Sequence, residues 1–255
     1  MDYLKLIKPR FHITFIMVIL GALLFAPAIP PSLFLTLLFL YLSFNVLLYG
    51  GIYTLNDIID VESDKKSPLK KTRPLPAGKI RISSALIFAA ILISFGLLSG
   101  MLFFSAPIVQ MYSIFLVLNL FYTLVAKKIP YLELITNAAT HPLRFFMGAL
   151  LVEGSAPYLL LFAIFLLAFG IACTKRRFEM EDGGWSARPI LRFYSGNKLI
   201  LLQLSALAVV LLLPIIDTQT SKILYLAVTT CYVTIVFGVY FIRPVKTFIK
   251  TLMFT

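Results

Sequence analysis

Residues 33–64 read LFLTLLFLYLSFNVLLYGGIYTLNDIIDVESD, an apolar run that ends in a group of acids. The first part of this stretch, residues 33–55, carries no charged side chain. The hydrocarbon core of a bilayer is about 30 Å thick, so a spanning helix needs about 20 mostly apolar residues. The sequence therefore predicts that residues 33–55 cross a membrane as a helix and deliver the acids to one of its surfaces.

Similar apolar runs recur along the whole chain of 255 residues, of which 60% are hydrophobic and 13% charged. Soluble domains carry about twice that share of charge. The eight runs are residues 11–29, 33–55, 82–101, 103–125, 132–151, 157–174, 198–216 and 222–242. We therefore expect an all-α, polytopic membrane bundle of eight transmembrane helices.

The first run has an alternative interpretation as a secretory signal, because basic residues precede it and small residues follow it. Pro27, Pro30 and Pro31 crowd the region where cleavage would occur, and the run is long for a signal peptide. We therefore favour a retained helix over a cleaved leader.

The basic residues predict the topology. All of the 23 lysines and arginines except Lys222 and Arg144 lie in alternate connecting stretches. These stretches are residues 1–10, 57–81, 126–131, 175–198 and 243–255. Cytoplasmic loops are enriched in Lys and Arg, so both termini are expected in the cytoplasm. The net charge of +12 is then a topological signal that also attracts anionic lipids and phosphorylated substrates, and it indicates no nucleic-acid partner.

Seven of the 11 acids occupy two of these cytoplasmic stretches. In the first, Asn56, Asp60 and Asp64 fall at i, i+4 and i+8, on one face of a continuing helix. Carboxylates stacked in this way repel one another unless a cation lies between them, and hard oxygen ligands suit Mg²⁺. Lysines and Arg73 follow directly and could bind phosphate oxygens. The alternative is a solvated helix end followed by an ordinary basic loop.

The second acidic stretch, residues 173–182, reads CTKRRFEMED. On a helix Lys175, Glu179 and Asp182 share a face, so cation and carboxylate are mixed there. Such a surface suits an anion as well as a metal, although it could also be only a basic anchor with an incidental ion pair.

One charge lies inside an apolar run. Asn137, His141, Arg144 and Gly148 follow one another at helical spacing and form a polar stripe. A charged side chain within a membrane is costly unless it faces a cavity or a partner. The stripe therefore predicts an anion-lined cavity, although His141 could simply make a hydrogen bond between helices.

Residues 53–64, YTLNDIIDVESD, with RPLPAG at residues 73–78, closely resemble the first Asp-rich motif of the UbiA superfamily of intramembrane transferases, NDxxDxxxD followed by RPxxxG. The resemblance continues at Tyr122 with Lys127 and at Arg144 with Gly148, and extends over about residues 5–245. It implies one domain over residues 1–255, built as nine helices around a central cavity where Mg²⁺ binds a diphosphate. Residues 243–255 are too few to cross a bilayer, so the ninth helix is expected to be missing, shortened or a surface segment.

The second motif departs from the DxxxD that is usual in prenyltransferases. Residues 175–179 read KRRFE and residues 188–195 read RPILRFYS, which is similar to the decaprenyl-phosphate phosphoribosyltransferase branch. The resemblance implies Mg²⁺ on Asp57, Asp60 and Asp64, with Glu179 as a further catalytic acid. The implied substrate-binding residues are Asn56, Lys70, Arg73, Tyr122, Lys127, Arg144, Lys175, Arg176 and Asp182.

The favoured reaction is transfer of phosphoribose from phosphoribosyl diphosphate to a polyprenyl phosphate. A first alternative is transfer of a prenyl group from an allylic diphosphate to an aromatic or lipid acceptor, where Phe and Tyr rings could shield the carbocation. A second is anion transport, although transporters keep their coupling charges near the bilayer midplane. Both enzymatic readings require the two acidic stretches to meet across one pocket, and the sequence leaves the oligomeric state open.

Overall fold

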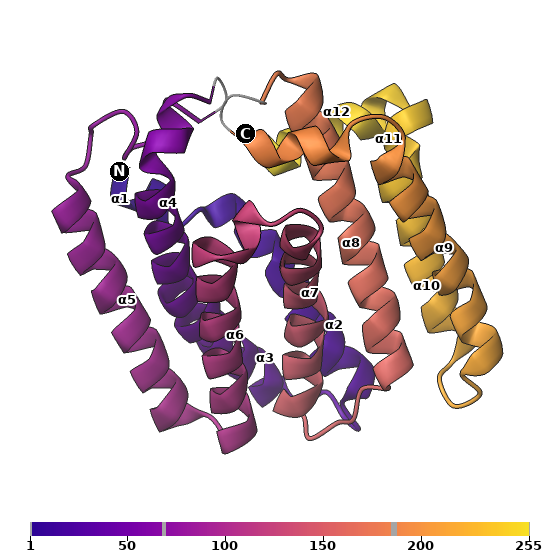
Figure 1. The fold of residues 1–255 in the computed structure, drawn as a ribbon. Helices are drawn as coiled ribbons and strands as arrows, with labels where there is room; N and C mark the ends of the chain where they lie inside the picture. The colour runs from indigo at the N-terminus through magenta and orange to yellow at the C-terminus, as the bar shows by residue number, and fades with distance from the viewer. Residues whose placement is uncertain (1, 68–69, 185–187, 255) are drawn as a thin grey trace. The chain divides into compact units, whose positions relative to one another are not determined.

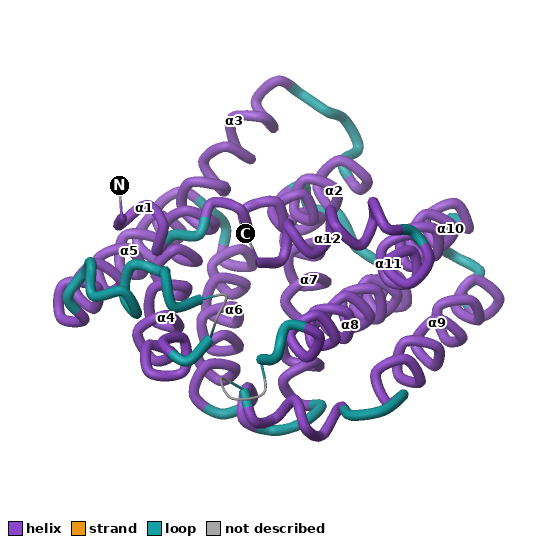
Figure 2. Tube along the Cα trace, turned by 90° about the horizontal axis from the view of Figure 1, so that it is seen from above, coloured by secondary structure: helices purple, strands orange, loops and turns teal. Residues whose placement is uncertain are grey.

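The computed structural model describes residues 2–67, 70–184 and 188–254, and these residues form helices and turns without a strand (Figure 1). The chain divides into two compact units, one of Met1–Val125 with Leu143–Ser155 and the other of Ala126–Pro142 with Ala156–Thr255. The chain passes between the units within helix α7 (Leu132–Leu151). In Figure 2 the loops connect the helices, and the connection between α4 and α5 is a long one.

The first unit contains, in chain order, α1 (Asp2–Leu6), η1 (Pro9–Phe15), α2 (Ile16–Phe25), α3 (Pro31–Leu40), η2 (Tyr41–Leu48), α4 (Tyr49–Lys65), α5 (Ile82–Phe103), α6 (Ala106–Leu124) and the second half of α7. The segments α3, η2 and α4 form one continuous helix of 35 residues. At 1.5 Å per residue it is about 50 Å long, well beyond the bilayer core. Its last turns, which carry the acids, therefore extend past the apolar segment as predicted.

The second unit contains η3 (Ala126–Lys128), the first half of α7, α8 (Tyr158–Glu181), η4 (Pro189–Tyr194), α9 (Lys198–Ile216), α10 (Lys222–Cys231), η5 (Tyr232–Phe237), α11 (Gly238–Phe241) and α12 (Arg243–Phe254). Gln203 ties its helices together inside the core. The Gln203 amide donates to Gly170 and Thr174 of α8, and its side-chain oxygen accepts from Tyr240. A buried amide with its hydrogen bonds satisfied in this way fixes the packing of the three helices.

Among the described residues, six helices are long and apolar enough to cross a membrane. They are Pro31–Lys65, Ile82–Phe103, Ala106–Lys128, Tyr158–Glu181, Lys198–Ile216 and Lys222–Phe241. Two of the eight expected spans are not among them. The first is the shorter apolar segment Pro9–Phe25, and the second is α7, which carries Glu133 and Arg144. The all-α membrane bundle is confirmed, whereas the number of crossings stays a prediction.

The C-terminal helix α12 lies where the ninth helix of the family was expected to be missing, shortened or a surface segment. Its 12 residues span about 18 Å, too little to cross a bilayer. Ile249 is buried against Phe178 of α8 and Val239 of α11, whereas Phe248 is 66% exposed. The helix is therefore a surface segment that packs on the second unit along one face.

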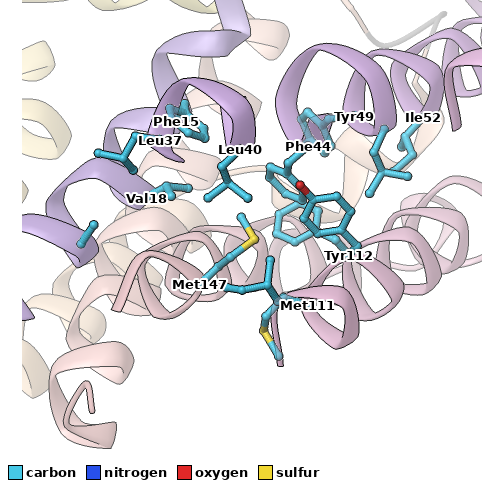
Figure 3. Packing of buried hydrophobic residues seen from close by; sticks show 14 of the residues in the cluster. Phe15, Val18, Leu37, Leu40, Phe44, Tyr49, Ile52, Met111, Tyr112 and Met147 are labelled. Carbon is cyan, nitrogen blue, oxygen red and sulfur yellow. The ribbon is translucent and has the colours of Figure 1, made fainter. Parts of the chain in front are cut away.

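The core of the first unit is rich in aromatic and branched side chains from α2, α3, η2, α4, α6 and the end of α7 (Figure 3). Two glycines bring α2 and α7 into backbone contact. A Cβ atom added to Gly21 would lie 1.9 Å from the Phe145 carbonyl oxygen, and one added to Gly148 would lie 1.9 Å from the Val18 oxygen. Small residues permit such close helix packing in membranes. Gly148 therefore packs against α2, contrary to the cavity-lining role expected from the polar stripe.

Candidate functional site

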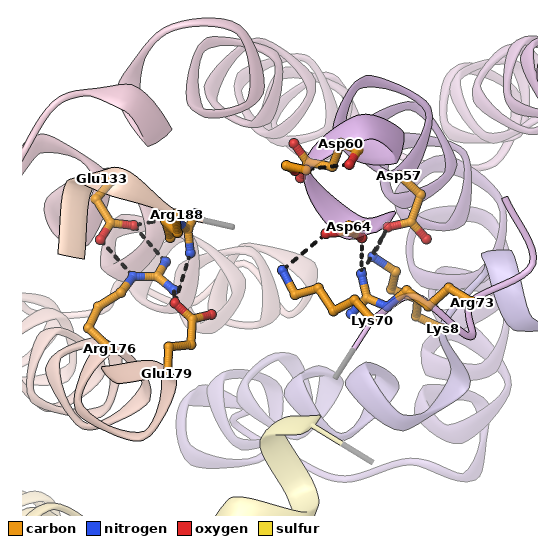
Figure 4. A network of polar contacts seen from close by, with 11 residues as sticks. Lys8, Asp57, Asp60, Asp64, Lys70, Arg73, Glu133, Arg176, Glu179 and Arg188 are labelled. Carbon is orange, nitrogen blue, oxygen red and sulfur yellow. Dashed lines mark hydrogen bonds and ion pairs between the residues drawn. The ribbon is translucent and has the colours of Figure 1, made fainter. Parts of the chain in front are cut away.

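The first charged cluster lies at the end of α4. Asp57 and Asp64 are 3% and 2% exposed, and with Asp60 they lie on one face of the helix (Figure 4). Lys8 Nζ is 2.6 Å from Asp57 Oδ1, and Lys70 Nζ is 3.4 Å from Asp64 Oδ1. Arg73 Nη1 contacts both acids, at 2.9 Å from Asp64 Oδ2 and 3.4 Å from Asp57 Oδ1. These three cations neutralise the carboxylates of Asp57 and Asp64.

Lys8 is a member of this cluster that sequence reasoning missed, because it was counted only among the basic residues that set the topology. Its backbone is left-handed, with φ of 53°, and its side chain is buried against the Tyr53 ring, 5.0 Å from Nζ to the ring centroid. Burial lowers the pKa of the Lys8 ammonium from its ordinary value, and the neighbouring Asp57 carboxylate partly offsets this. A strained, buried lysine beside an acid is more typical of a site than of a surface loop.

The other residues implied for the first motif lie nearby or on the adjoining helix. The Asn56 side-chain oxygen accepts a hydrogen bond from Thr123 of α6, at 3.2 Å, and so points toward that helix. Glu62 is highly exposed and pairs with Lys65, so it lies off the face of Asp57 and Asp64. Tyr122 is half-buried in α6.

The carboxylates on α4 have the right chemistry for Mg²⁺, which prefers hard oxygen ligands. Among residues 2–67, 70–184 and 188–254, no three His, Cys, Asp or Glu side chains are grouped closely enough to form a complete protein cage. Mg²⁺ seldom needs one, since it keeps several waters and binds through one or two carboxylates together with substrate phosphates. One or two of the carboxylates of Asp57, Asp60 and Asp64 would therefore suffice for a metal that arrives with a phosphorylated ligand, and a site that uses all three stays a prediction.

Arg144, the charge inside an apolar run, lies among aromatic rings of the first unit. The side chain is 1% exposed, and its guanidinium carbon is 4.3 Å from the Tyr49 ring centroid and 4.6 Å from that of Phe115. Ring faces attract cations electrostatically, most strongly where water is excluded. The aromatic core of this unit therefore helps to offset the cost of burying Arg144.

The second charged cluster joins α8, the first turn of α7 and the segment around η4 (Figure 4). Arg176 Nε and Nη2 are each 2.6 Å from an oxygen of Glu133, a bidentate pair, and Nη1 is 2.7 Å from Glu179 Oε2. Arg188 Nη1 is 3.2 Å from the same Glu179 oxygen. The Tyr194 hydroxyl donates to Glu133 at 3.1 Å.

Glu133 is the second residue that sequence reasoning missed. It is fully buried, but in the sequence it is only a lone acid at the start of an apolar run. Its partners come from the KRRFE and RPILRFYS stretches, so these two motifs form one structural network through Glu133. Lys175 is half-buried on α8, and Lys127 lies in η3 of the same unit.

Asp182, expected to contact substrate, is the C-cap of α8 and forms an ion pair with Lys250 of α12. Glu181 pairs with Lys246 of the same helix at 2.9 Å. These contacts fasten α12 to the end of α8. The expected meeting of the two charged clusters on one diphosphate stays a prediction, because the clusters belong to different units.

Long apolar helices that end in clusters of paired acids and bases define an integral membrane protein. The model of the UbiA prenyltransferase family matches residues 14–247, so the chain belongs to that family.

Similar proteins agree with this membership. The chain is 44% identical over 62 residues to digeranylgeranylglyceryl phosphate synthase of Methanocaldococcus jannaschii, covering 24% of this chain and 20% of that protein. It is 34% identical over 105 residues to protoheme IX farnesyltransferase of a Synechococcus species, covering 38% and 29%. The chain thus matches less than a third of the length of these curated relatives.

Solved structures share the fold over nearly the whole chain. A UbiA homologue from Archaeoglobus fulgidus bound to GPP and Mg²⁺ has a TM-score of 0.73 at 15% identity, covering 99% of this chain and 95% of that one. A structure of digeranylgeranylglyceryl phosphate synthase has a TM-score of 0.69 at 22% identity, covering 99% and 93%. The UbiA fold predicted from the sequence is therefore confirmed.

Proposed function

We propose that this chain is a Mg²⁺-dependent membrane transferase that cleaves a diphosphate donor and passes the released group to a second substrate. The observation that carries the proposal is the cluster of Asp57, Asp60 and Asp64 with Lys8, Lys70 and Arg73 at the end of α4. Carboxylates for a metal beside cations for phosphate oxygens are the two halves of a diphosphate site. The homologue solved with GPP and Mg²⁺ supports the same assignment.

The favoured donor is phosphoribosyl diphosphate and the favoured acceptor a polyprenyl phosphate. In this reaction an oxygen of the lipid phosphate forms a bond to the ribose C1 while the bond from C1 to the diphosphate oxygen breaks. The diphosphate leaves with the electron pair, and no proton has to move because the acceptor is already an anion. The KRRFE and RPILRFYS stretches, which meet at Glu133, support this branch.

Each part of the first cluster has a task in this scheme. Mg²⁺ held by Asp57, Asp60 and Asp64 would neutralise the negative charge that grows on the departing diphosphate. Lys70 and Arg73 are partly exposed on the loop after α4 and would exchange their carboxylates for phosphate oxygens. The rate enhancement would then come from positioning and charge neutralisation.

The second candidate is prenyl transfer from an allylic diphosphate. The 23 Phe and 12 Tyr residues of the chain supply ring faces that would stabilise the carbocation formed in this reaction. The named relatives are prenyltransferases or bind prenyl diphosphates, which also supports this candidate.

The two candidates are separated by offering the purified protein, in lipid nanodiscs with Mg²⁺, each donor and acceptor pair. We expect mass spectrometry to detect a phosphoribosylated polyprenyl phosphate from phosphoribosyl diphosphate. Turnover with geranylgeranyl diphosphate alone would exclude the favoured reaction and establish the second. No product from either pair, in protein that binds metal and diphosphate, would exclude both.

We also infer that the charged clusters face the cytoplasm together with both termini. The inference rests on the distribution of lysines and arginines between the connecting stretches. A cytoplasmic orientation would also give the clusters direct access to water-soluble phosphorylated donors, which are made inside the cell.

A further inference from the structure

The second charged cluster satisfies its own charges. Glu133 and Glu179 contribute two negative charges, and Arg176 and Arg188 contribute two positive ones. Three guanidinium nitrogens of Arg176 contact carboxylate oxygens at 2.6–2.7 Å (Figure 4). A DxxxD motif in the same stretch would instead present carboxylates with no cation between them, and such a pair requires a metal.

The carboxylate oxygens of this cluster are poorly placed to bind a metal. Glu133 Oε1 accepts hydrogen bonds from Arg176 and Tyr194, and its Oε2 accepts from Arg176 and lies 3.9 Å from Arg188. Glu179 Oε2 is shared between the two arginines. A divalent ion at these oxygens would lie directly against two guanidinium groups, and like charges in a buried site repel strongly.

The loop cations of the first cluster are more exposed than Arg176 of the second. In the first cluster Lys70 and Arg73 come from a loop, and their side chains are 26% and 22% exposed. In the second cluster Arg176 lies in the last two turns of α8 and its side chain is 2% exposed. Metal and phosphate can therefore displace the loop cations of the first cluster more easily than they can displace Arg176.

We propose that the second charged cluster binds no metal ion, and that its Arg188 binds a phosphate oxygen of the substrate directly. This proposal rests on the proposed function and refines it by confining the metal to Asp57, Asp60 and Asp64. Arg176 is then a positioning residue that replaces a metal as the partner of Glu133 and Glu179. This positioning role replaces two expectations from the sequence, which were that Arg176 contacts the substrate and that Glu179 is catalytic.

Arg188 is suited to this task by its accessibility and its anchoring. Its side chain is 22% exposed, whereas that of Arg176 is 2% exposed. The following segment η4 is fixed by buried Ile190 and Leu191 and by Tyr194, whose hydroxyl accepts a hydrogen bond from the Tyr131 amide. A partly exposed guanidinium that pairs with Glu179 and lies near Glu133 presents its N–H groups in the planar arrangement that matches phosphate.

The metal part is tested by counting Mn²⁺ ions bound to the purified full chain with electron paramagnetic resonance, in the presence of inorganic diphosphate. We expect Glu179→Gln to bind as many Mn²⁺ ions per chain as the wild type, and Asp60→Asn to lose bound Mn²⁺. Loss of a Mn²⁺ ion from Glu179→Gln would overturn the proposal. A wild type that binds none would instead refute the metal site of the proposed function and leave the second cluster metal-free.

The phosphate part is tested by calorimetric titration of inorganic diphosphate at saturating Mn²⁺. We expect Arg188→Gln to weaken binding at least tenfold and Arg188→Lys to recover part of the loss. Arg192→Gln is the matched control, because Arg192 lies in the same segment with an exposed side chain. If Arg188→Gln and Arg192→Gln lose the same amount of diphosphate affinity, the loss reflects only the removed positive charge, and the role of Arg188 is overturned. Unchanged diphosphate affinity in Arg188→Gln would overturn it as well.

Discussion

At the scale of single residues, the acids of α4 are not equivalent. Asp60 lies on the helix face of Asp57 and Asp64, whereas Glu62 is exposed and pairs with Lys65. Mutation of a residue that only supports a metal ligand lowers metal affinity or activity about 10–100-fold. Mutation of a ligand itself should therefore lower activity at least about 100-fold. We expect this fall in kcat for Asp60→Asn and a near wild-type rate for Glu62→Gln, measured as product formed against Mg²⁺ concentration. Equal rates in the two variants would count against metal binding on this face.

Lys8 gives a second prediction at this scale. Its ammonium group lies 2.6 Å from Asp57 Oδ1, where a metal would also bind. Removing this positive charge should therefore strengthen metal binding, because two cations no longer compete for one carboxylate. We expect Lys8→Met to lower the Kd for Mn²⁺ at least about fivefold, because this pair is buried and an exposed pair already contributes up to roughly 1 kcal/mol. Lys5→Met, which removes an exposed lysine paired with Asp2, should leave the Kd unchanged.

At the scale of elements, the turn between α9 and α10 depends on Asp217. Its carboxylate accepts hydrogen bonds from the Gln219 and Thr220 amides and from the Thr220 and Tyr225 hydroxyls. These bonds, that from the Thr220 hydroxyl above all, hold the pKa of Asp217 below its ordinary value.

A lowered pKa in the folded state means that Asp217 stabilises the fold at pH values above its ordinary pKa of about 3.9, and that this stabilisation is lost as the pH falls through the folded value. We expect Asp217→Asn to lower Tm at pH 7 and to show a smaller further decrease on acidification than the wild type. Thermal unfolding of detergent-solubilised protein between pH 7 and pH 3 measures both. Parallel curves for the two proteins would contradict the assignment.

Helix α12 is held by buried contacts more than by its ion pairs. Exposed pairs such as Lys246 with Glu181 contribute about 0–1 kcal/mol, whereas Ile249 is buried against Phe178. We expect Ile249→Asp to detach the helix and to accelerate tryptic cleavage at Lys246 and Lys250 at least tenfold, as followed by mass spectrometry. Thr247→Asp places the same charge on the exposed side of the helix, so trypsin should cleave this variant at the wild-type rate.

At the scale of the whole molecule, the sequence predicts best what depends on local pattern. The run 198–216 coincides with α9, and 82–101 nearly coincides with α5, because long uncharged stretches have few alternatives. The run 11–29 is less accurate, since α2 already ends at Phe25, before the prolines at 27, 30 and 31. Helical spacing likewise predicted the shared face of Asp60 and Asp64.

Contacts between distant segments were beyond such patterns. Lys8 and Asp57 are 49 residues apart, and Glu133 and Arg176 are 43 apart. Periodicity relates a residue only to its neighbours within a few turns, so neither pair could be foreseen. Both pairs match a buried acid to a base, as the cost of burying an isolated charge demands. Most residues of the two clusters, although not Lys8 and Glu133, were therefore predicted from the sequence, whereas the pairs that they form were not.

The topology of the whole chain depends on α7, which is long enough to cross a bilayer but contains Glu133 and Arg144. Five expected crossings, α7 included, separate the loop after α4 from the turn between α9 and α10. An odd number places Lys71 and Thr218 on opposite sides of the membrane. In a chain with Cys173 and Cys231 replaced by serine, we expect a membrane-impermeant maleimide to label Thr218→Cys in intact cells and Lys71→Cys only after lysis. Labelling of both in intact cells, or of neither, would mean that α7 does not cross, because one crossing fewer puts the two positions on the same side.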